Sequence, residues 1–537
     1  QAHYIDMPPG LFLAEHPHAT ESIIYCVRGQ FVLCSGGRRQ LMKPGSLMWF
    51  KANEPTGWEV PFNEPAYILI FKGSRSEKSD DEFLDYLRGL AEKLNKEQAD
   101  GTPYHFRDLP ADHPAREFAR KVNPDFEAKL PLVSAINPQP DPNPQAIRPF
   151  TIRVGDAVLA ELRERLARTR WPDTIEGSGW EYGVDLAYLK ELVDYWRTKY
   201  DWREQERRLN QFPQFVTEID GIDLHFLHVR SKEPGALPLA IIHGWPGSFV
   251  EFTKIIGPLT DPVAHGGKPE DAFHVICPSL PGFGFSGKPR EPGWSSQRMA
   301  EMIAKLMARL GYERYGAQGG DWGAGVTRWL AANDGGHCVG GHSNFPPASQ
   351  PPDDPMRGVT PQELERIQQR VRELNDHKAY GAIQGTRPLT LGYGLNDSPA
   401  GLAAWVVDKF WAWSDHGGNL ENSFTKDELL TNVMIYWVTG TMPSSVRIYY
   451  ESSHNNPRPS SMTPFASSGK PAPMGFALFP KEINVPPRAW VERNMEGSLV
   501  HWTEMPRGGH FAAMEQPELL IEDVRKFFRP LRDSSER

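Results

Sequence analysis

Asp321 lies in a segment whose spacing suits nucleophilic chemistry. Residues 312–324 read YERYGAQGGDWGA, so glycines stand two positions before and two positions after Asp321, between an expected short strand and an expected helix. This pattern is typical of a nucleophile elbow, a sharp turn with little room for neighbouring side chains. A carboxylate there, at the positive end of the helix, suits attack on a saturated carbon and an alkyl-enzyme ester. A glycine-rich turn capped by aspartate is the alternative.

A second loop, His243-Gly244-Trp245-Pro246-Gly247, directly follows the apolar run LPLAII at 237–242. In an elbow-type enzyme such a loop lines the site and supplies a backbone N–H to the oxyanion hole, and the residue after the nucleophile supplies another. The sequence therefore predicts the N–H groups of Trp245 and Trp322 as the two donors. A turn that merely ends a strand would also explain the proline and glycines.

A histidine and an acid would complete this chemistry. His510 follows two glycines in RGGHF, which places it on a tight loop as a candidate general base for water. Glu482, in FALFPKEIN, precedes it in the chain order nucleophile, acid, histidine, so we expect Glu482 to orient His510. The rival acids stand in a polar helix or the last strand, where solvated faces are usual: Glu492, Glu496 and Glu504.

Length and composition narrow the class of protein. The 537 residues predict two or three domains, and the net charge of −9 argues against sequence-independent binding of nucleic acid, which needs surplus cations. The four cysteines lack metal-ligand spacing, which predicts buried thiols in a reducing compartment. No apolar run approaches the ~20 residues that cross a bilayer and no signal peptide is recognisable, so we expect a cytoplasmic protein without a membrane anchor.

The chain divides by its patterns. Residues 1–75 carry short β-rich runs and turn glycines, which predicts a small barrel or sandwich. Residues 76–145 begin with a charged helical stretch and end in a Pro-rich linker. From about 146 onward, a hairpin signal at Asp220-Gly221 is followed by short apolar strands that alternate with helices, which predicts an α/β fold with a parallel sheet.

Residues 147–530 resemble the microsomal-type epoxide hydrolases of the α/β-hydrolase superfamily. The motifs that carry the resemblance are HGWPG at 243–247, GGDWG at 319–323, RGGHFAAMEQPELL at 507–520 and, upstream, FTIRVGDAVLAELRERLARTRWPD and WRTKYDWREQERRLNQFPQF. The resemblance implies an α/β-hydrolase core in 236–349 and 456–537, interrupted by a helical lid at 350–455. It also implies an N-terminal meander at 146–235 that wraps the core.

The same resemblance implies two lid tyrosines, Tyr380 and Tyr449, whose O–H groups hold the epoxide oxygen as charge develops on it. Tyr450 is the neighbour most easily confused with Tyr449, and Tyr393 and Tyr436 are weaker candidates. Aromatic side chains that could form pocket walls are Trp245, Trp322 and Phe410, with core packing as the alternative for each. Tryptophan and phenylalanine in the lid point to an apolar, aromatic epoxide, as in detoxification or aromatic hydrocarbon catabolism.

The implied reaction needs no cofactor or metal. Asp321 attacks an epoxide carbon, His510 activates a water that hydrolyses the ester, and a vicinal diol leaves. The expected partner is a small-molecule epoxide, with a homodimer left open. A haloalkane dehalogenase-like enzyme would share Asp321 and His510, but paired tyrosines favour an epoxide oxygen over a halide. A third possibility is a ligand sensor built on a hydrolase that has lost its activity. The presence of Asp321, His510 and an acid candidate argues against it, because the fold does not require these residues.

Residues 10–73 resemble a cupin, a small β-barrel that often binds a metal. Gly10, His16, His18 and Gly29 fit the first cupin motif, and PGSLMWFKANEP at 44–55 fits the second. The pattern departs where the motifs have a glutamate and a further histidine, at Ser22 and Thr56. A divalent metal prefers three or four well-placed ligands, so we expect a barrel without a tightly held catalytic metal. Ligand binding and dimerisation both stay open as its role.

Overall fold

The computed structural model describes residues 2–17, 21–62, 64–72, 106, 109, 112–123, 145–334, 336–454, 471–495 and 497–532. The chain forms two compact units, the first made of 1–141 with 155–157 and the second of the remainder. Each unit has its own hydrophobic core. The charged helical stretch and most of the Pro-rich linker that the sequence predicts lie outside the described residues, as does His18.

The first unit is the predicted small all-β barrel, made of two antiparallel four-stranded sheets. One sheet has the order β1 (Ala2–Met7), β8 (Ala66–Lys72), β3 (Ser22–Arg28), β6 (Leu47–Phe50), and the other has the order β2 (Phe12–Pro17), β7 (Pro55–Glu59), β4 (Phe31–Ser35), β5 (Arg38–Met42). Ile24 and Leu33 are among the alternate residues buried between the sheets. Gly36 and Gly37 turn the chain with positive φ, and the Glu15 carboxylate accepts hydrogen bonds from both N–H groups (2.7 and 2.8 Å).

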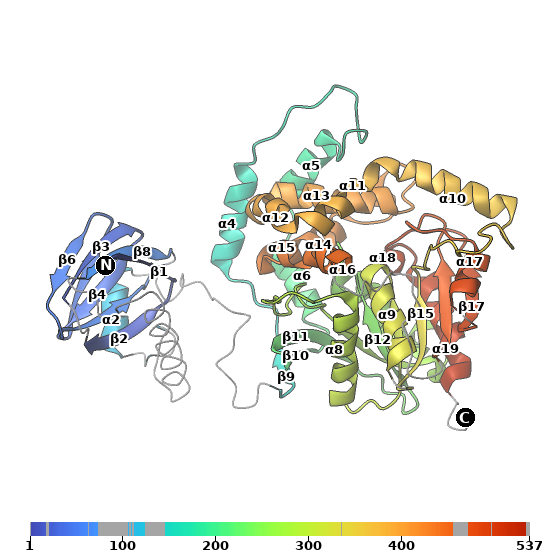
Figure 1. Ribbon diagram of the computed structural model, residues 1–537, viewed down its shortest axis with the longest axis horizontal. Helices are drawn as coiled ribbons and strands as arrows, with labels where there is room; N and C mark the ends of the chain where they lie inside the picture. The colour runs from blue at the N-terminus through green and yellow to red at the C-terminus, as the bar shows by residue number, and fades with distance from the viewer. Residues whose placement is uncertain are drawn as a thin grey trace. The chain divides into compact units, whose positions relative to one another are not determined.

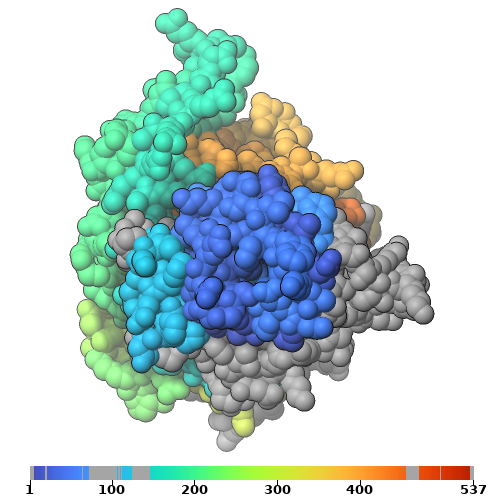
Figure 2. All heavy atoms as spheres, turned by 90° about the vertical axis from the view of Figure 1, so that its left-hand side faces the viewer, coloured from blue at the N-terminus to red at the C-terminus, as the bar shows by residue number. Residues whose placement is uncertain are grey.

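Helix α2 (Pro114–Val122) covers the second of these sheets. The ring of Phe12 on β2 meets Phe106 and His113 edge to face, with centroids 5.9 and 5.4 Å apart. Asn123, just after the helix, donates a hydrogen bond to the carbonyl of Pro61 (2.8 Å). In the space-filling view the cyan atoms of this segment lie directly against the blue atoms of the strands (Figure 2).

A nine-stranded sheet forms the centre of the second unit. Its order is β17 (Leu499–Glu504), β16 (Met474–Leu478), β15 (Cys338–Ser343), β14 (Tyr315–Gly319), β12 (Leu237–Ile242), β13 (Phe273–Pro278), β11 (Ile222–Val229), β10 (Gln214–Ile219), β9 (Arg148–Phe150). The strands from β17 to β13 are parallel, but β11, β10 and β9 pair antiparallel. The parallel sheet that the alternating strands and helices predict is therefore confirmed from β17 to β13, and the Asp220-Gly221 hairpin extends it with an antiparallel edge that the sequence pattern did not place.

Helices cover both faces of this sheet (Figure 1). Thr327 of α9 (Asp321–Asn333) lies over Gly341 of β15, whereas Phe527 of α19 (Pro517–Arg532) lies over the adjacent Gly340. Neighbouring residues of a strand face opposite sides, so α9 and α19 form separate layers. The other helices near the sheet are α6 (Trp202–Leu209), α7 (Thr253–Thr260), α8 (Ser296–Arg309), α17 (Arg488–Asn494) and α18 (Ala512–Glu515), whereas α4 (Asp156–Ala167) and α5 (Leu186–Thr198) lie beside the lid helices (Figure 1).

The predicted lid is helical and gathers at one end of the sheet (Figure 1). Its helices are α10 (Pro361–Glu373), α11 (Ala379–Thr386), α12 (Pro388–Asp397), α13 (Pro399–Trp413), α14 (Lys426–Thr439), α15 (Met442–Ser445) and α16 (Arg447–His454). Lid residues such as Val406 and Leu430 are fully buried in the same cluster as the strands, so lid and sheet share one core. Within the described part of the chain, every helix is too short or too polar to cross a membrane.

Gly323 and Gly325 lie in the same turn of α9 but in different surroundings. A Cβ at position 323 would lie 2.1 Å from the carbonyl oxygen of Ile242 in β12, whereas one at position 325 would come no closer than 3.6 Å to Ser296. We expect Gly323→Ala to lower the free energy of unfolding by about 3 kcal/mol, because α9 must move off β12. Gly325→Ala should leave it unchanged or raise it by up to about 1 kcal/mol. Urea unfolding followed by circular dichroism measures both, and equal losses would contradict this packing.

Candidate active site

Asp321 occupies the sharp turn that the sequence predicts. It is separated from the end of β14 only by Gly320, is the first residue of α9, and adopts a positive φ of 50°. The glycines around it have no room for a side chain: a Cβ at Gly319 would lie 2.5 Å from the carbonyl oxygen of Gly323. The carboxylate therefore lies at the helix N-terminus, where the helix dipole stabilises its charge.

The loop after β12 approaches the Asp321 carboxylate closely. The N–H of Trp245 donates a hydrogen bond to its Oδ1 (2.9 Å). A Cβ at Gly244 would lie only 2.3 Å from the same oxygen, which explains why glycine is needed there. One of the two predicted oxyanion donors thus contacts the predicted nucleophile, whereas the role of the Trp322 N–H stays a prediction.

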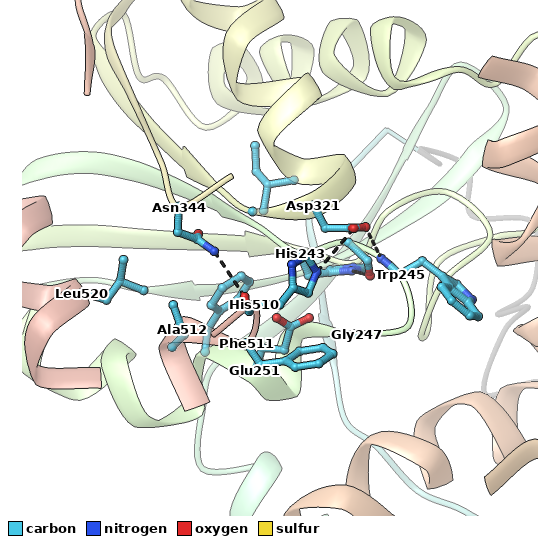
Figure 3. Close-up of a pocket in the computed structure, with 15 residues that line it drawn as sticks. His243, Trp245, Gly247, Glu251, Asp321, Asn344, His510, Phe511, Ala512 and Leu520 are labelled. Atoms are coloured by element: carbon cyan, nitrogen blue, oxygen red, sulfur yellow. Dashed lines mark hydrogen bonds and ion pairs between the residues drawn. The ribbon is translucent and has the colours of Figure 1, made fainter. Parts of the chain in front are cut away.

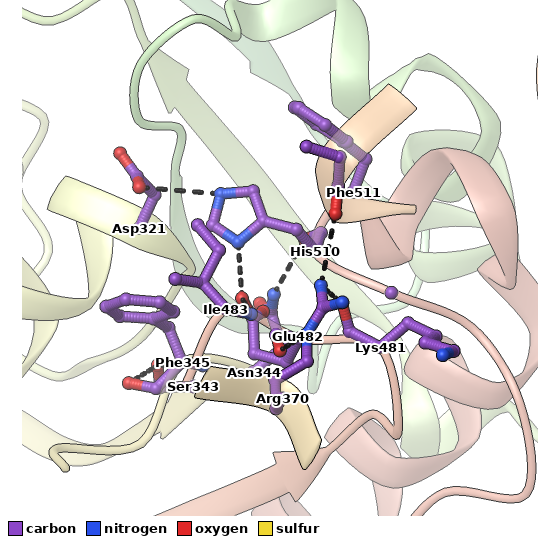
Figure 4. Close-up of polar contacts among 12 residues, drawn as sticks. Asp321, Ser343, Asn344, Phe345, Arg370, Lys481, Glu482, Ile483, His510 and Phe511 are labelled. Carbon is purple, nitrogen blue, oxygen red and sulfur yellow. Dashed lines mark hydrogen bonds and ion pairs between the residues drawn. The ribbon is translucent and has the colours of Figure 1, made fainter. Parts of the chain in front are cut away.

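His510 stands between two carboxylates (Figure 4). Its Nε2 lies 3.4 Å from Oδ2 of Asp321, and its Nδ1 lies 2.5 Å from Oε1 of Glu482. Glu482 is fully buried and His510 nearly so. The structure therefore brings together the nucleophile, base and acid that the sequence predicts, in the order that an acid–histidine pair needs to activate water at Asp321.

The two carboxylates control the protonation of His510. Burial alone would lower the pKa of His510, but the charges and hydrogen bonds of Glu482 and Asp321 outweigh burial and raise it well above 6.5. Esterification of Asp321 would remove one of these charges. The pKa of His510 would then fall, which frees the imidazole to act as a base when an ester is there to hydrolyse.

Two polar side chains support the acid and the base from behind. Arg370 of lid helix α10 is buried and donates hydrogen bonds to the carbonyls of Glu482 (2.8 Å) and Lys481 (2.6 Å). Asn344, at the end of β15, donates to the carbonyl of His510 (3.3 Å). Both side chains bind backbone carbonyls. Because every residue has a backbone carbonyl, such a bond cannot be recognised from residue types, and Arg370 and Asn344 were not predicted from the sequence.

Tyr380 and Tyr449 face each other from α11 and α16. Their ring centroids lie 5.8 Å apart, with the Trp245 ring stacked on Tyr380 at 5.5 Å and edge-on to Tyr449 at 5.7 Å. The ring of Trp322 meets Tyr449 edge to face at 4.8 Å. Burial and the charge of Asp321 raise the pKa of both phenols, so each keeps its proton at neutral pH and can donate it to a bound oxygen.

The rival tyrosines lie elsewhere. Tyr393 is 73% exposed, and Tyr450 stacks on His454 at 3.9 Å on the outer side of α16. Tyr436 is buried and donates a hydrogen bond to the carbonyl of Gly247 (2.6 Å), so it holds the loop after β12 and not a ligand. Asn432, one turn earlier on α14, donates to the carbonyl of Pro246 (2.7 Å).

The rival acids are occupied on the surface. Glu492 pairs with Arg488 (2.7 Å) and Glu504 pairs with Arg366 (3.1 Å), whereas Glu496 lies outside the described residues. Of the described candidates, Glu482 alone contacts His510.

His243 and Phe410 have structural surroundings. Burial lowers the pKa of His243 to about 4, and its Nε2 accepts a hydrogen bond from the N–H of Leu280 (3.2 Å), so this ring fixes the loop. Phe410 is fully buried, and its ring stacks on the ring of Phe511, the residue after His510, with centroids 3.9 Å apart. Of the two alternatives for Phe410, pocket wall and core packing, the structure therefore shows core packing, which supports the histidine loop.

Two partly buried glutamates near His510 were not predicted. Glu515 accepts hydrogen bonds from the N–H groups of Gly509 (3.0 Å), Phe511 (3.0 Å) and Asp415 (2.8 Å), which pins the histidine loop. Glu251 lies on the short 3-10 turn η2 (Phe249–Phe252) and lines the same hollow as Asp321 and His510 (Figure 3). Glu251 stands four positions after Gly247, the last residue of the HGWPG motif, so it lies just outside the motif that marked this loop in the sequence.

In the first unit, the positions where the cupin motifs depart are buried. Ser22 is 3% exposed and Thr56 is 1% exposed, and Thr56 pairs with His16 across β2 and β7. Among the residues that the structure describes, no group of three or more His, Cys, Asp or Glu side chains could hold a metal ion. All four cysteines are unpaired and buried, as predicted.

Comparison with known proteins agrees with the geometry. Family models match in three places: "Epoxide hydrolase N terminus" over 147–252, "alpha/beta hydrolase fold" over 238–357 and "Cupin domain" over 3–72. A protein of Stigmatella aurantiaca assigned as an epoxide hydrolase is 48% identical over 387 residues, covering 72% of this chain and 86% of that protein. Epoxide hydrolase 1 of Sus scrofa is 39% identical over 406 residues, covering 71% and 88%. The crystal structure of juvenile hormone epoxide hydrolase from the silkworm Bombyx mori matches with a TM-score of 0.66 at 32% identity, covering 73% of this chain and 96% of that chain.

The ion pairs of His510 predict a pH-dependent stability. Its pKa is raised on folding, so these pairs stabilise the folded protein fully below the unfolded-state pKa of about 6.5, and the contribution is lost as pH rises through the folded-state pKa. Glu482→Gln removes a buried partner and should cost about 3 kcal/mol at pH 6. The deficit should shrink as pH rises, which urea unfolding at several pH values measures. The same deficit at every pH would show that packing, and not charge, makes the difference.

Proposed function

The chain belongs to the epoxide hydrolases, and we propose that Asp321, His510, Glu482, Tyr380 and Tyr449 carry out the hydrolysis of an epoxide to a vicinal diol. The observation that carries the proposal is the position of His510, with Nε2 3.4 Å from the Asp321 carboxylate and Nδ1 2.5 Å from Glu482. A base so close to a carboxylate nucleophile serves hydrolysis of an ester formed on that carboxylate.

In the first step, one carboxylate oxygen of Asp321 attacks an epoxide carbon, and the bond from that carbon to the ring oxygen breaks. Tyr380 and Tyr449 both donate to the ring oxygen, and one of them transfers its proton as the negative charge develops. The product is a hydroxyalkyl ester of Asp321. No metal or cofactor is part of the proposed step.

In the second step, His510 takes a proton from water, and the water oxygen attacks the ester carbonyl carbon. The N–H of Trp245, which already contacts Oδ1, and the N–H of Trp322 stabilise the oxyanion. Glu482 stabilises the imidazolium through Nδ1. The diol leaves with the proton from His510. The second proton of the water passes from the Asp321 carboxyl group to the tyrosine that gave up its proton in the first step, which restores the carboxylate and the phenol.

The walls of the site support an apolar substrate. The rings of Trp245, Trp322 and Trp413 contact the two tyrosines. The ring centroid of Trp413 lies 5.2 Å from that of Tyr380 and also 5.2 Å from that of His510. We therefore propose an apolar, aromatic epoxide as the substrate class, in line with a role in detoxification or hydrocarbon catabolism. Donated phenol protons suit an oxygen leaving group, which favours an epoxide over the haloalkane alternative.

A cytoplasmic location and a homodimer are further parts of this proposal. The outer face of the β1-β8-β3-β6 sheet supports the dimer, because it exposes large apolar side chains that a soluble monomer rarely gathers in one place: Tyr25, Val27, Leu47, Trp49 and Phe71.

The ester mechanism predicts opposite behaviour for two variants. Asp321→Asn should lose at least about 1,000-fold in steady turnover, because an amide is a poor nucleophile. His510→Gln should form one equivalent of ester and then hydrolyse it about 1,000-fold more slowly than the wild type. Single-turnover reaction with styrene oxide in oxygen-18 water, followed by peptide mass spectrometry, should place label on Asp321 of the wild type. Diol formed without label in Asp321 would exclude the ester and make this residue a base.

The tyrosine assignment predicts a contrast between neighbours. Tyr380→Phe and Tyr449→Phe should each slow ester formation by about 100-fold, since each removes a donor to the ring oxygen. Tyr450→Phe, one residue away but on the outer side of α16, should stay within about twofold of the wild type. Stopped-flow tryptophan fluorescence measures ester formation. A loss in Tyr450→Phe equal to that in Tyr449→Phe would show that α16 presents a different face to the substrate.

A further inference from the structure

The hollow beside Asp321 has room for a single water molecule. Its volume is about 20 Å³, and its polar lining comes from Glu251, Asp321, Asn344, His243 and His510. A cavity of this size holds about one water, which needs two to four polar partners. Water consumed at the ester must reach the ester carbon next to His510, so this hollow lies where the second step needs it.

Glu251 is aimed into this hollow by the turn that carries it. Its neighbours Phe249, Val250 and Phe252 are buried in the core, and Ser248 caps the turn by accepting a hydrogen bond from the N–H of Val250 (3.3 Å). Figure 3 shows the carboxyl group of Glu251 pointing toward the ring of His510, with Asp321 beyond the ring.

A glycine leaves the space that this carboxyl group occupies. A Cβ at Gly247 would lie 1.4 Å from Oε1 of Glu251, so any other residue at 247 would displace the carboxyl. In the described part of the chain, no hydrogen bond or ion pair joins Glu251 directly to His510 or Asp321. The gap between these groups is therefore available to a bridging water.

We propose that Glu251 holds the hydrolytic water against His510, an inference that rests on the ester mechanism proposed above. One hydrogen of the water points to Nε2 of His510 and the other to a carboxyl oxygen of Glu251. A lone pair of the water oxygen is thereby directed at the ester carbonyl carbon of Asp321. His510 takes one proton and later returns it to the leaving diol, whereas Glu251 keeps its own protonation state throughout.

The protonation of Glu251 suits this task. Burial raises its pKa to about 8, with His510 opposing the rise and the Asp321 charge adding to it. A neutral carboxyl group can still accept the water hydrogen through its carbonyl oxygen. It also adds no negative charge beside the oxyanion that forms on the ester, which a carboxylate would destabilise.

Two substitutions at this position test the proposal. Glu251→Leu removes the acceptor at similar volume, whereas Glu251→Gln keeps a neutral carbonyl acceptor. We expect both variants to form the ester within about threefold of the wild-type rate, because the first step does not use this water. Glu251→Leu should hydrolyse the ester about 100-fold more slowly, the size of effect that follows from a misplaced reactant, and Glu251→Gln should stay within about fivefold of the wild type.

Stopped-flow fluorescence separates the two rates, and intact-protein mass spectrometry counts accumulated ester. For Glu251→Leu, kcat and KM should fall together while kcat/KM stays nearly constant, a split that loss of folding would not give. The proposal is overturned if both steps slow alike, if hydrolysis is unchanged in Glu251→Leu, or if Glu251→Gln is as slow as Glu251→Leu. Absence of label on Asp321 in the wild type would instead reject the ester mechanism itself, so the two failures can be told apart.

Discussion

The contact between the Asp321 carboxylate and the backbone of Gly244 and Trp245 places two strand ends within hydrogen-bond distance of each other. It requires Asp321 to adopt a positive φ, which costs a non-glycine residue on the order of 1 kcal/mol or more, and it requires a residue without Cβ at 244. The packing of α9 on β12 at Gly323 holds this conformation in place. The position of the nucleophile is therefore determined by how closely a helix and two parallel strands approach, and the other groups of the site are arranged around it.

The lid takes part in this arrangement. Tyr436 and Asn432 of α14 hold the carbonyls of Gly247 and Pro246, and Arg370 of α10 holds the carbonyls of the loop that carries Glu482. Each bond joins a lid side chain to the backbone of a catalytic loop. The lid thus fixes the backbone of the loops that carry Trp245 and Glu482 in addition to carrying Tyr380 and Tyr449, and its burial in the common core makes these bonds part of the folded unit.

The sequence was sufficient to predict that Asp321, His510 and Glu482 come together, because glycine spacing and chain order are local signals of an elbow and a base. Tyr449 could be separated from Tyr450 only through the family resemblance, since neighbours on a helix differ by about 100° in direction and the sequence does not give the phase. Glu251 and Arg370 were missed because their partners are brought near by tertiary packing. The antiparallel edge was missed for a similar reason: the hairpin is a local signal, but its pairing with β13 is not.

The hydrogen bonds from α10 and α14 to the catalytic loops bear on how this enzyme can be re-engineered. A lid that is exchanged whole with that of a relative brings a new pocket shape, but it also removes a phenol, an amide and a guanidinium that hold core carbonyls in place. A chimera would keep its catalytic geometry only if the donor lid carried the equivalents of Tyr436, Asn432 and Arg370. Variation of substrate range is therefore better sought in side chains that line the pocket than in transplanting the domain that covers it.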